Sequence, residues 1–277
     1  MTASSMSIRF WGVRGSISSS GASTARYGGY TPCVEVRCGG HVLIFDAGTG
    51  IRPLGNALMQ EADVTDFDIF LSHCHIDHVI GLPFFAPMFS NNHSVRLWAG
   101  NLLPACGVED AVRKLMSFPL FPIGVDAFKA KLEFRDFRAG DTLDPRPGVT
   151  MRTAPLNHPG GAAGYRIDFA GRSIAYLTDM ECGDGPIDPA VVALAKGAAL
   201  VILDAAYTDD ELPARVGWGH SSWQQGVRLA NAAGAQRLCL FHHDPDHDDA
   251  FIDEIAKAAD RARPGTIVSS YGLFLHV

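Results

Sequence analysis

The segment FDIFLSHCHIDHVIGLPFF, residues 67–85, constrains the fold of this chain more than any other. An apolar run ends at Leu71, and the next seven residues include four potential metal ligands, His73, His75, Asp77 and His78. Neutral imidazole and carboxylate groups are ligands for borderline divalent cations. Side chains two residues apart in extended backbone point the same way, so His73 and His75 are expected to face one cavity. This density indicates a site for two metal ions rather than an exposed polar loop.

Short apolar segments recur along the chain and predict a protein rich in strands. The expected strands are 7–10, 33–37, 42–46, 67–71, 95–98, 131–134, 150–154, 163–169, 173–177, 200–203, 237–241 and 266–277. The expected helices are 51–60, 109–116, 189–196, 222–233 and 249–261. Strands dominate both halves, which indicates two packed sheets with helices outside them. Neither a linker nor a repeat interrupts the sequence, so residues 1–277 are expected to form a single domain.

Composition excludes several classes of protein. The formal charge of −7 argues against a broad, sequence-independent nucleic-acid surface, which needs basic residues. The N-terminal sequence has no apolar stretch of signal-peptide length, and no later stretch reaches the ~18 apolar residues of a membrane helix. Cys33 and Cys38 lie on one expected strand and point to opposite faces, so they cannot pair with each other. Six cysteines without an export signal favour a cytoplasmic protein.

Four further motifs accompany SHCHIDH in the sequence. They are LIFDAGTG (43–50), APLNHPGGAAGYRI (154–167), IAYLTDME (174–181) and RLCLFHHDP (237–245). In this order they resemble the motifs of the metallo-β-lactamase superfamily, and the resemblance covers most of the chain. It implies an α/β fold, an αββα sandwich of two mixed sheets flanked by helices, with metal ions at one edge between the sheets.

The resemblance also implies a ligand set for two divalent cations. One cation is assigned to His73, His75 and His158, and the other to Asp77, His78 and His242. Asp179 and a hydroxide would bridge the two. Zinc is the expected metal for this histidine-rich set, with manganese and iron as alternatives.

Residues of the last and of the first of these motifs complete the expected site. His242 directly follows the apolar run 238–241 and is preferred as the ligand, with His243 as the alternative. Asp46 ends a strand in the first motif and is expected to hydrogen-bond the ligand loop rather than to bind metal.

The segments GLPFF, GYRI and GHSS resemble the phosphodiesterase branch of the superfamily, which includes tRNase Z and phosphodiesterases for small cyclic phosphates. GHSS (219–222) is similar to the GHST loop of tRNase Z, so His220 and Asp77 are the candidate catalytic residues. Ser221 and Gln224 have the spacing of a capping box before the helix that follows. A tRNase Z has a long arm between the third histidine ligand and the bridging aspartate, whereas His158 and Asp179 are only 21 residues apart.

The expected function is therefore metal-dependent hydrolysis of small cyclic or nucleotide-like phosphodiesters, with neither nucleic acid nor a membrane as partner. The alternatives are hydrolysis of a thioester, lactone or β-lactam on the same metals, and a metal-bearing sensor with weak turnover. The sequence leaves the oligomeric state open. Residues 102–130 form either a packed surface segment or an apolar wall over the site, for which Phe118, Phe121 and Phe128 are the candidates.

Overall fold

The computed structural model describes residues 5–183, 185 and 187–277, and in this part of the chain the strands form two seven-stranded sheets. The predicted domain of residues 1–277 thus includes residues 1–4, 184 and 186, which lie outside the described part. The strand order is β14-β1-β2-β3-β4-β5-β6 in the first sheet and β13-β12-β11-β10-β9-β8-β7 in the second.

Each sheet mixes parallel and antiparallel pairs. The strands of the first sheet are β1 (Met6–Gly12), β2 (Cys33–Cys38), β3 (His41–Phe45), β4 (Asp66–Leu71), β5 (Ser94–Ala99), β6 (Lys131–Asp136) and β14 (Phe274–His276). Those of the second are β7 (Thr142–Arg146), β8 (Val149–Leu156), β9 (Ala162–Phe169), β10 (Arg172–Leu177), β11 (Leu200–Asp204), β12 (Leu238–Phe241) and β13 (Ile267–Val268). The helices are α1 (Ile51–Leu58), α2 (Ile76–Val79), α3 (Val108–Leu115), α4 (Pro189–Ala195), α5 (Trp223–Ala232) and α6 (Asp249–Ala262).

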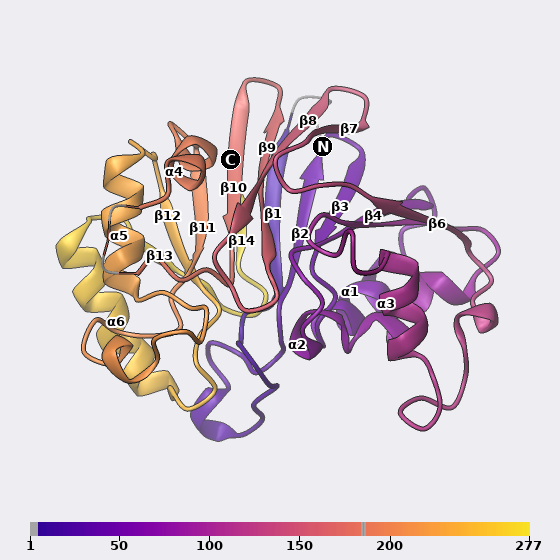
Figure 1. The fold of residues 1–277 in the computed structure, drawn as a ribbon, viewed down its shortest axis with the longest axis horizontal. Coiled ribbons are helices and arrows are strands. Elements are labelled where there is room, and N and C mark those ends of the chain that lie inside the picture. Colours follow the sequence, from indigo (N-terminus) through magenta and orange to yellow (C-terminus); the bar gives the residue numbers. More distant parts are fainter. Residues whose placement is uncertain (1–4, 184, 186) are drawn as a thin grey trace.

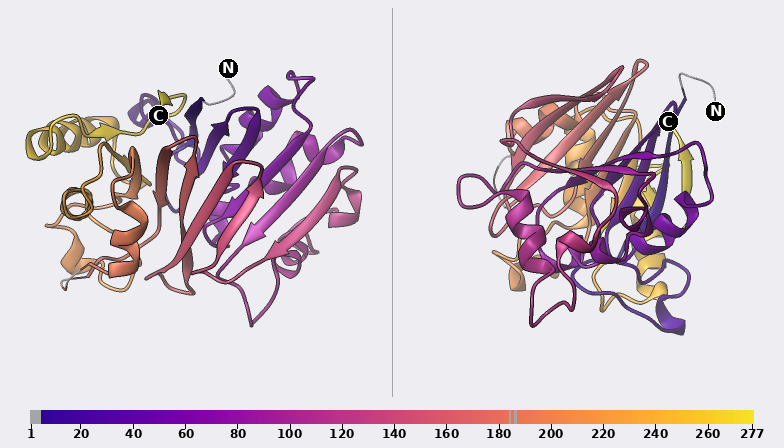
Figure 2. Two further views of the ribbon diagram at one scale, coloured as in Figure 1. Left: turned by 90° about the horizontal axis from the view of Figure 1, so that it is seen from above. Right: turned by 90° about the vertical axis from the view of Figure 1, so that its right-hand side faces the viewer.

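The two sheets pack face to face, with helices on both outer faces (Figure 1, Figure 2). Helices α1 and α3 cover the first sheet, and α4, α5 and α6 cover the second. Large side chains fill the space between the sheets, among them Phe10, Phe45, Tyr165 and Phe241, all fully buried. The αββα sandwich expected from the sequence is thereby confirmed.

The two faces of strand β2 pack into different layers of the sandwich. Cys33 packs with the apolar cluster that includes α1, whereas Cys38 packs with the cluster between the sheets. The prediction that these thiols point to opposite faces is confirmed, and both are free. Among the described helices, none has the length and apolarity that crossing a lipid bilayer requires.

Three elements differ from the sequence-based expectations. The segment 266–277 is not one strand, because β13 pairs with β12 in one sheet and β14 with β1 in the other. Gly272, with a φ of 82°, lies in the turn between them. Strand β7 was not expected, because it contains Pro145; an edge strand tolerates proline, and β7 is an edge of its sheet. Helix α2 is a single turn inside the segment that was expected to carry only ligands.

The topology positions the candidate site. Strands β3 and β4 run parallel, as do β10, β11 and β12, so within each sheet their carboxyl ends meet at one edge. The polar motif residues follow directly after these ends, and the edges of both sheets therefore supply one shared site.

Candidate metal centre

The loop after β4 brings three histidines and an aspartate to the edge of the first sheet. His73 follows Ser72 directly after β4, and both are buried, while His75 is the residue that precedes α2. Asp77 and His78 lie on that helical turn, and both are buried although they are polar. Burying so many polar groups next to one another is costly unless each has a partner.

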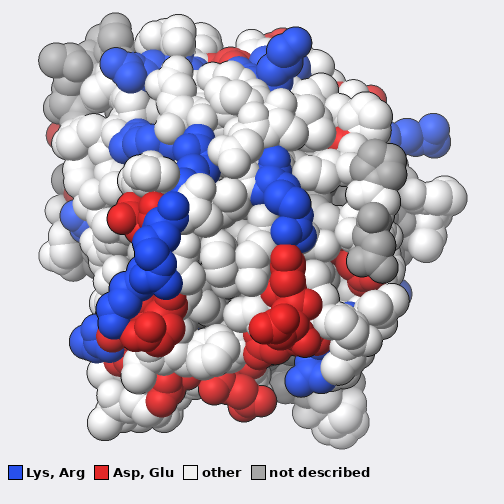
Figure 3. Space-filling model, turned by 90° about the vertical axis from the view of Figure 1, so that its left-hand side faces the viewer, with Lys and Arg blue, Asp and Glu red and all other residues white. Residues whose placement is uncertain are grey.

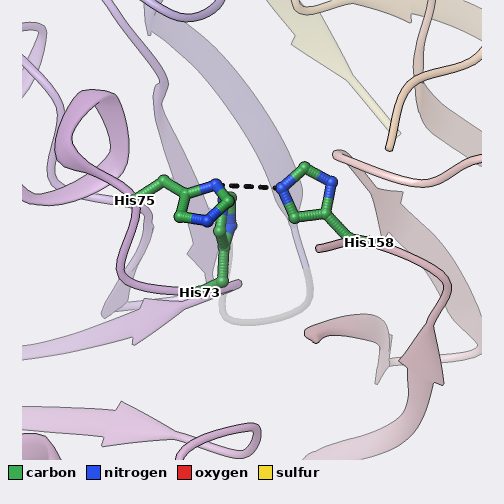
Figure 4. Close-up of side chains that lie close together, drawn as sticks. All are labelled: His73, His75 and His158. Carbon is green, nitrogen blue, oxygen red and sulfur yellow. Dashed lines mark hydrogen bonds between the residues drawn. The ribbon is translucent and has the colours of Figure 1, made fainter. Parts of the chain in front are cut away.

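One group of ligand atoms comes from both sheets. His73 and His75 belong to the loop after β4, and His158 belongs to the loop between β8 and β9. Figure 4 shows the three rings converging, with His75 Nδ1 and His158 Nε2 joined across 3.0 Å. The ring centroid of His73 lies 4.5 Å from that of His75 and 4.6 Å from that of His158. The candidate ligand atoms of this group all lie within 4.8 Å of one another.

A second group, Asp77, His78 and His242, lies directly beside the first. The Nε2 atom of His242 is 3.4 Å from Asp77 Oδ2 and 3.3 Å from His78 Nε2. His243 points elsewhere: its Nε2 donates to the carbonyl oxygen of Ser269 at 2.9 Å, and burial lowers its pKa to about 3. Of the two sequence alternatives, the structure places His242 at the centre.

Asp179, directly after β10, lies between the two groups. Its Oδ2 is 3.2 Å from His78 Nε2 and 3.3 Å from His242 Nε2, while its Oδ1 is 3.9 Å from His73 Nε2. One carboxylate oxygen thus faces each group. This is the position that a ligand shared by two cations would need.

The donor set fits divalent cations. His158 Nδ1 donates to the carbonyl oxygen of Gly219 at 2.8 Å, and His78 Nδ1 donates to a carboxylate oxygen of Asp46 at 2.8 Å. In its neutral form each of these rings therefore presents the lone pair of its Nε2 atom to the site. His73 Nε2 is buried without a hydrogen-bond partner among the described residues. Burial also lowers the pKa of His73 and of His158, which keeps these imidazoles neutral, as metal binding requires. Lone pairs that converge in a buried site repel one another unless a cation lies between them.

Asp46 hydrogen-bonds the loop that carries the candidate ligands, as predicted. Its buried carboxylate accepts hydrogen bonds from the Ser72 N–H at 2.7 Å, from the His78 ring and from the Tyr176 hydroxyl at 2.8 Å. Outer hydrogen bonds of this kind fix the orientation and tautomer of a ligand histidine.

His220 lies beside the centre and is paired with Asp204, the last residue of β11. The Nδ1 atom of His220 donates to Asp204 Oδ2 at 2.8 Å and lies 3.8 Å from Asp179 Oδ1, and its ring stacks on that of His242 with 5.0 Å between centroids. Burial opposes protonation of His220, but the nearby carboxylates, Asp204 foremost, outweigh it and raise its pKa to about 9.

Asp204 was not predicted as a site residue, although its place at the end of a buried strand was a signal in the sequence. It ends a buried strand with a carboxylate, as Asp46 does directly after β3. Besides His220, Asp204 accepts from the backbone N–H groups of Asp179, Ala206 and Ser221. Every one of these partners is a donor, so both carboxylate oxygens of Asp204 are fixed in position beside the ring of His220.

The capping box of α5 is one residue later than expected. Ser222 is the N-cap, its side chain accepts from Gln225 N, and Gln225 bonds back to Ser222 N. Ser221 instead donates its hydroxyl to the carbonyl oxygen of Met180. This shift places His220 two residues before the cap, where Asp204 can reach it.

A substitution at Gly219 tests whether the position of His158 matters for metal binding. It has a φ of 83°, and a Cβ there would lie 2.2 Å from His158 Nδ1. Gly217 is a matched control, because it has a φ of 81°, donates to the same Glu181 oxygen as Gly219, and has no atom within 4 Å of the place its Cβ would take. We expect Gly219→Ala to weaken zinc binding by ~10–100-fold and Gly217→Ala to leave it within severalfold of wild type. Chelator competition measures both constants, and equal effects of the two substitutions would contradict this role of Gly219.

Residues 102–130 lie next to the ligand loop. Phe121 and Phe128 pack onto the apolar cluster below, against Phe84 and Phe89 with ring centroids 5.7 and 5.1 Å apart. Phe118 is 93% exposed. Two of the three phenylalanines suggested as a wall therefore contribute to the core, and the wall itself stays a prediction.

Comparison with known proteins gives one family and a consistent set of relatives. The family described as "Beta-lactamase superfamily domain" matches residues 41–243, which is most of the chain. Ribonuclease Z of Myxococcus xanthus is 24% identical over 263 residues, covering 78% of this chain and 81% of that protein. Ribonuclease Z of Brevibacillus brevis is 38% identical over 114 residues, covering 40% of this chain and 35% of that protein.

Solved structures show the same fold at low identity. The metallo-beta-lactamase fold protein YhfI from Bacillus subtilis aligns with a TM-score of 0.74 at 18% identity, covering 99% of this chain and 100% of that one. A diphosphatase from the PhnP family aligns at 0.69 with 20% identity, covering 98% of this chain and 97% of the other. The short form of human tRNase Z aligns at 0.67 with 17% identity, covering 97% and 98% respectively.

Proposed function

The chain belongs to the beta-lactamase superfamily as a metal-dependent hydrolase, and from this premise we propose that it cleaves phosphodiester bonds at a centre of two divalent cations. His73, His75 and His158 would bind one cation, and Asp77, His78 and His242 the other, with Asp179 shared. Zinc suits this set of histidines and carboxylates best, and manganese or iron are the alternatives. Two such cations, when bound, lower the pKa of a water and stabilise the charge on a phosphoryl group.

The single observation that carries the proposal is the His220–Asp204 pair beside this centre. Asp204 accepts the Nδ1 proton of His220, which orients the ring and stabilises its charged form. The imidazolium can then give its Nε2 proton to the departing oxygen of the substrate. A phosphodiester with an alkoxide leaving group requires such a proton, because a free alkoxide is a strong base. Asp77 is the other candidate catalytic residue; its Oδ2 accepts from the Ser16 N–H at 2.8 Å, which fixes the carboxylate next to His78 and His242.

We propose a small cyclic or nucleotide-like diester as the substrate, although relatives named ribonuclease Z leave substrate size open. Only the β9–β10 hairpin lies between the His158 loop and Asp179, which leaves no long arm in this segment. The face shown in Figure 3 carries basic side chains interspersed with acidic ones rather than a continuous basic surface. The net charge of −7 favours a small ligand over a long polyanion.

Hydrolysis of bis-p-nitrophenyl phosphate tests the reaction class. His75 is exposed, so alanine at this position removes a ligand without opening the core. We expect His75→Ala to reduce kcat/KM by ~10³-fold or more, because metal-derived stabilisation of the transition state amounts to several kcal/mol. Wild-type protein loaded with metal but no faster than His75→Ala would refute the proposal.

A parallel panel separates the remaining alternatives. Cyclic nucleotides, dinucleotides and a precursor tRNA compare substrate sizes, while a thioester, a lactone and a β-lactam represent other hydrolytic reactions. Turnover confined to the second set would replace the phosphodiesterase proposal, and tight metal binding without turnover of any member would favour a sensor.

A further inference from the structure

Arg14 lies two residues after β1, and its side chain is fully buried. Its guanidinium donates only to main-chain carbonyl oxygens. The Nη1 atom donates to Asp244 at 2.9 Å and to His247 at 2.8 Å, while Nε and Nη2 donate to Gly28 at 3.3 and 3.2 Å. Burial lowers the pKa of Arg14, but a guanidinium remains protonated in proteins. A buried charge is costly unless its hydrogen bonds are made, and these contacts provide them.

The segment 13–16, which contains Arg14, connects the two sheets at the edge that carries the candidate site. It follows β1 of the first sheet, and its main chain pairs with the loop after β12 of the second sheet. Gly15 N donates to the carbonyl oxygen of His243 at 2.8 Å, and His243 N donates to that of Val13 at 3.0 Å. The guanidinium of Arg14 binds the same loop further along. Main chain and side chain together therefore fasten this segment to the second sheet.

Residues 13–16 contact one candidate ligand from each sheet. Ser16 N donates to Asp77 Oδ2 at 2.8 Å, and Asp77 follows β4 of the first sheet. Gly15 packs closely on His242, which follows β12 of the second sheet: a Cβ on Gly15 would lie 2.5 Å from His242 Nδ1 and Cε1. Asp77 and His242 belong to the same group of candidate ligands. The position of this segment therefore affects both halves of that group.

The ring of His242 depends on packing for its orientation. The Nδ1 atoms of His78 and His158 donate to oxygen acceptors at 2.8 Å, which fixes those rings. His242 Nδ1, in contrast, is buried with no hydrogen-bond partner among the described residues. The close contacts of its ring include Gly15 and the stacked ring of His220. Because close-packed interiors transmit displacements, a shift of Gly15 would move this ring.

We infer that Arg14 is a positioning residue for only one of the two proposed cations, the one assigned to Asp77, His78 and His242. The guanidinium fixes residues 13–16 to the loop after β12, and through them it fixes two ligands from opposite sheets. In the described part of the chain, no hydrogen bond joins residues 13–16 to the ligands of the other cation, His73, His75 and His158. The inference rests on the proposed two-cation centre and goes beyond it, because the two sites should respond separately to one substitution.

Zinc titration in competition with a chelator tests this role. In Arg14→Lys the charge remains, but an ammonium group lacks the forked donors of guanidinium and cannot hold all three carbonyl oxygens in the same geometry. We expect this variant to bind one zinc within severalfold of wild type and the other ~10–100-fold more weakly, the range for residues that orient metal ligands. In the His242→Ala background, which already weakens the same site, Arg14→Lys should change the remaining constant little.

Gly15→Ala tests the same segment without removing a hydrogen bond. Its Cβ would displace the His242 ring, so we expect the same selective loss of one zinc. Gly40→Ala is the matched control, because Gly40 has no atom within 4 Å of the place its Cβ would take, and it should bind both zinc ions as wild type does. Should Arg14→Lys fail to fold, the comparison of Gly15→Ala with Gly40→Ala decides by the same criterion.

Arg166→Lys separates positioning from a general contribution to stability. Arg166 is another buried arginine that donates to main-chain carbonyl oxygens, those of Leu194 and Lys196 at 2.8 and 2.6 Å, and none of its hydrogen-bond partners is a candidate ligand. This variant should lose thermal stability and keep both zinc constants within severalfold of wild type. Unchanged zinc binding in Arg14→Lys, equal weakening of both zinc ions, or the same selective loss in Arg166→Lys would overturn the inference.

The titration needs no turnover, so it separates this inference from the proposed reaction. Selective zinc loss in a protein that hydrolyses no diester would support the role of Arg14 and contradict only the phosphodiesterase proposal. Diester hydrolysis with zinc binding that Arg14→Lys and Gly15→Ala leave unchanged would contradict only the role of Arg14. A wild-type protein that binds a single zinc would contradict the two-cation centre and this inference together.

Discussion

Asp179→Ala is expected to empty both metal sites and to reduce phosphodiester hydrolysis by ~10⁴-fold or more, since several kcal/mol of transition-state stabilisation depend on the cations. The carboxylate is central because its Oδ2 approaches His78 and His242 at 3.2 and 3.3 Å while its Oδ1 faces His73 at 3.9 Å. A ligand shared by two cations also keeps their charges from repelling each other. Its loss therefore affects each site directly. Elemental analysis of metal per chain, with kcat/KM for the same preparations, measures both consequences.

Two other substitutions make this result interpretable. His242→Ala removes a ligand from one group only, and we expect it to weaken mainly one metal. Asp188→Ala removes an aspartate that caps α4 by accepting from Ala190 N, and it should retain both metals with a small loss of stability. If Asp179→Ala still binds two metals tightly, the carboxylate does not bridge them.

The structure brings the predicted ligand residues close together because they follow buried strands directly. A buried strand ends abruptly where polar residues begin, as at Leu71 before Ser72 or at Phe241 before His242. Both sheets end at the same edge, so motifs far apart in sequence come together without any long-range information beyond strand order. Backbone geometry supports the same positions: Asp46, Asp179 and His242 all have positive φ, at 60°, 55° and 63°. Such strain in residues other than glycine is typical of functional sites.

What the sequence did not reveal depends on contacts between segments. The Asp204–His220 pair joins the end of β11 to the loop before α5, and neither residue has a local pattern that predicts the other. The capping box was misplaced by one residue because Ser221 and Ser222 are adjacent and Gln224 and Gln225 follow them, so both registers satisfy the motif. Tertiary contacts decide between them, because the Ser221 hydroxyl donates to the carbonyl oxygen of Met180 instead of capping the helix.

His220→Ala is expected to keep both metals and to slow a nucleotide diester by ~10²–10⁴-fold, the range of general acid catalysis. Its effect should depend on the leaving group. The alkoxide of a nucleotide diester needs the proton that His220 supplies, whereas p-nitrophenolate is a far weaker base and leaves without it. The loss with bis-p-nitrophenyl phosphate should therefore be clearly smaller. His276→Ala, at an exposed histidine on β14, is the matched control and should change neither rate.

The ratio of the two losses distinguishes proton donation from other roles of His220. A side chain that only stabilised negative charge on phosphoryl oxygens would slow both substrates equally, because that charge does not depend on the leaving group. A side chain that only supported the fold would lower metal content or stability, since His220 stacks on His242 at 5.0 Å. Unchanged rates for both substrates would mean that His220 takes no part in the reaction. Only a proton delivered to the leaving oxygen, through a ring held by Asp204 at 2.8 Å, makes the nucleotide diester the more sensitive substrate.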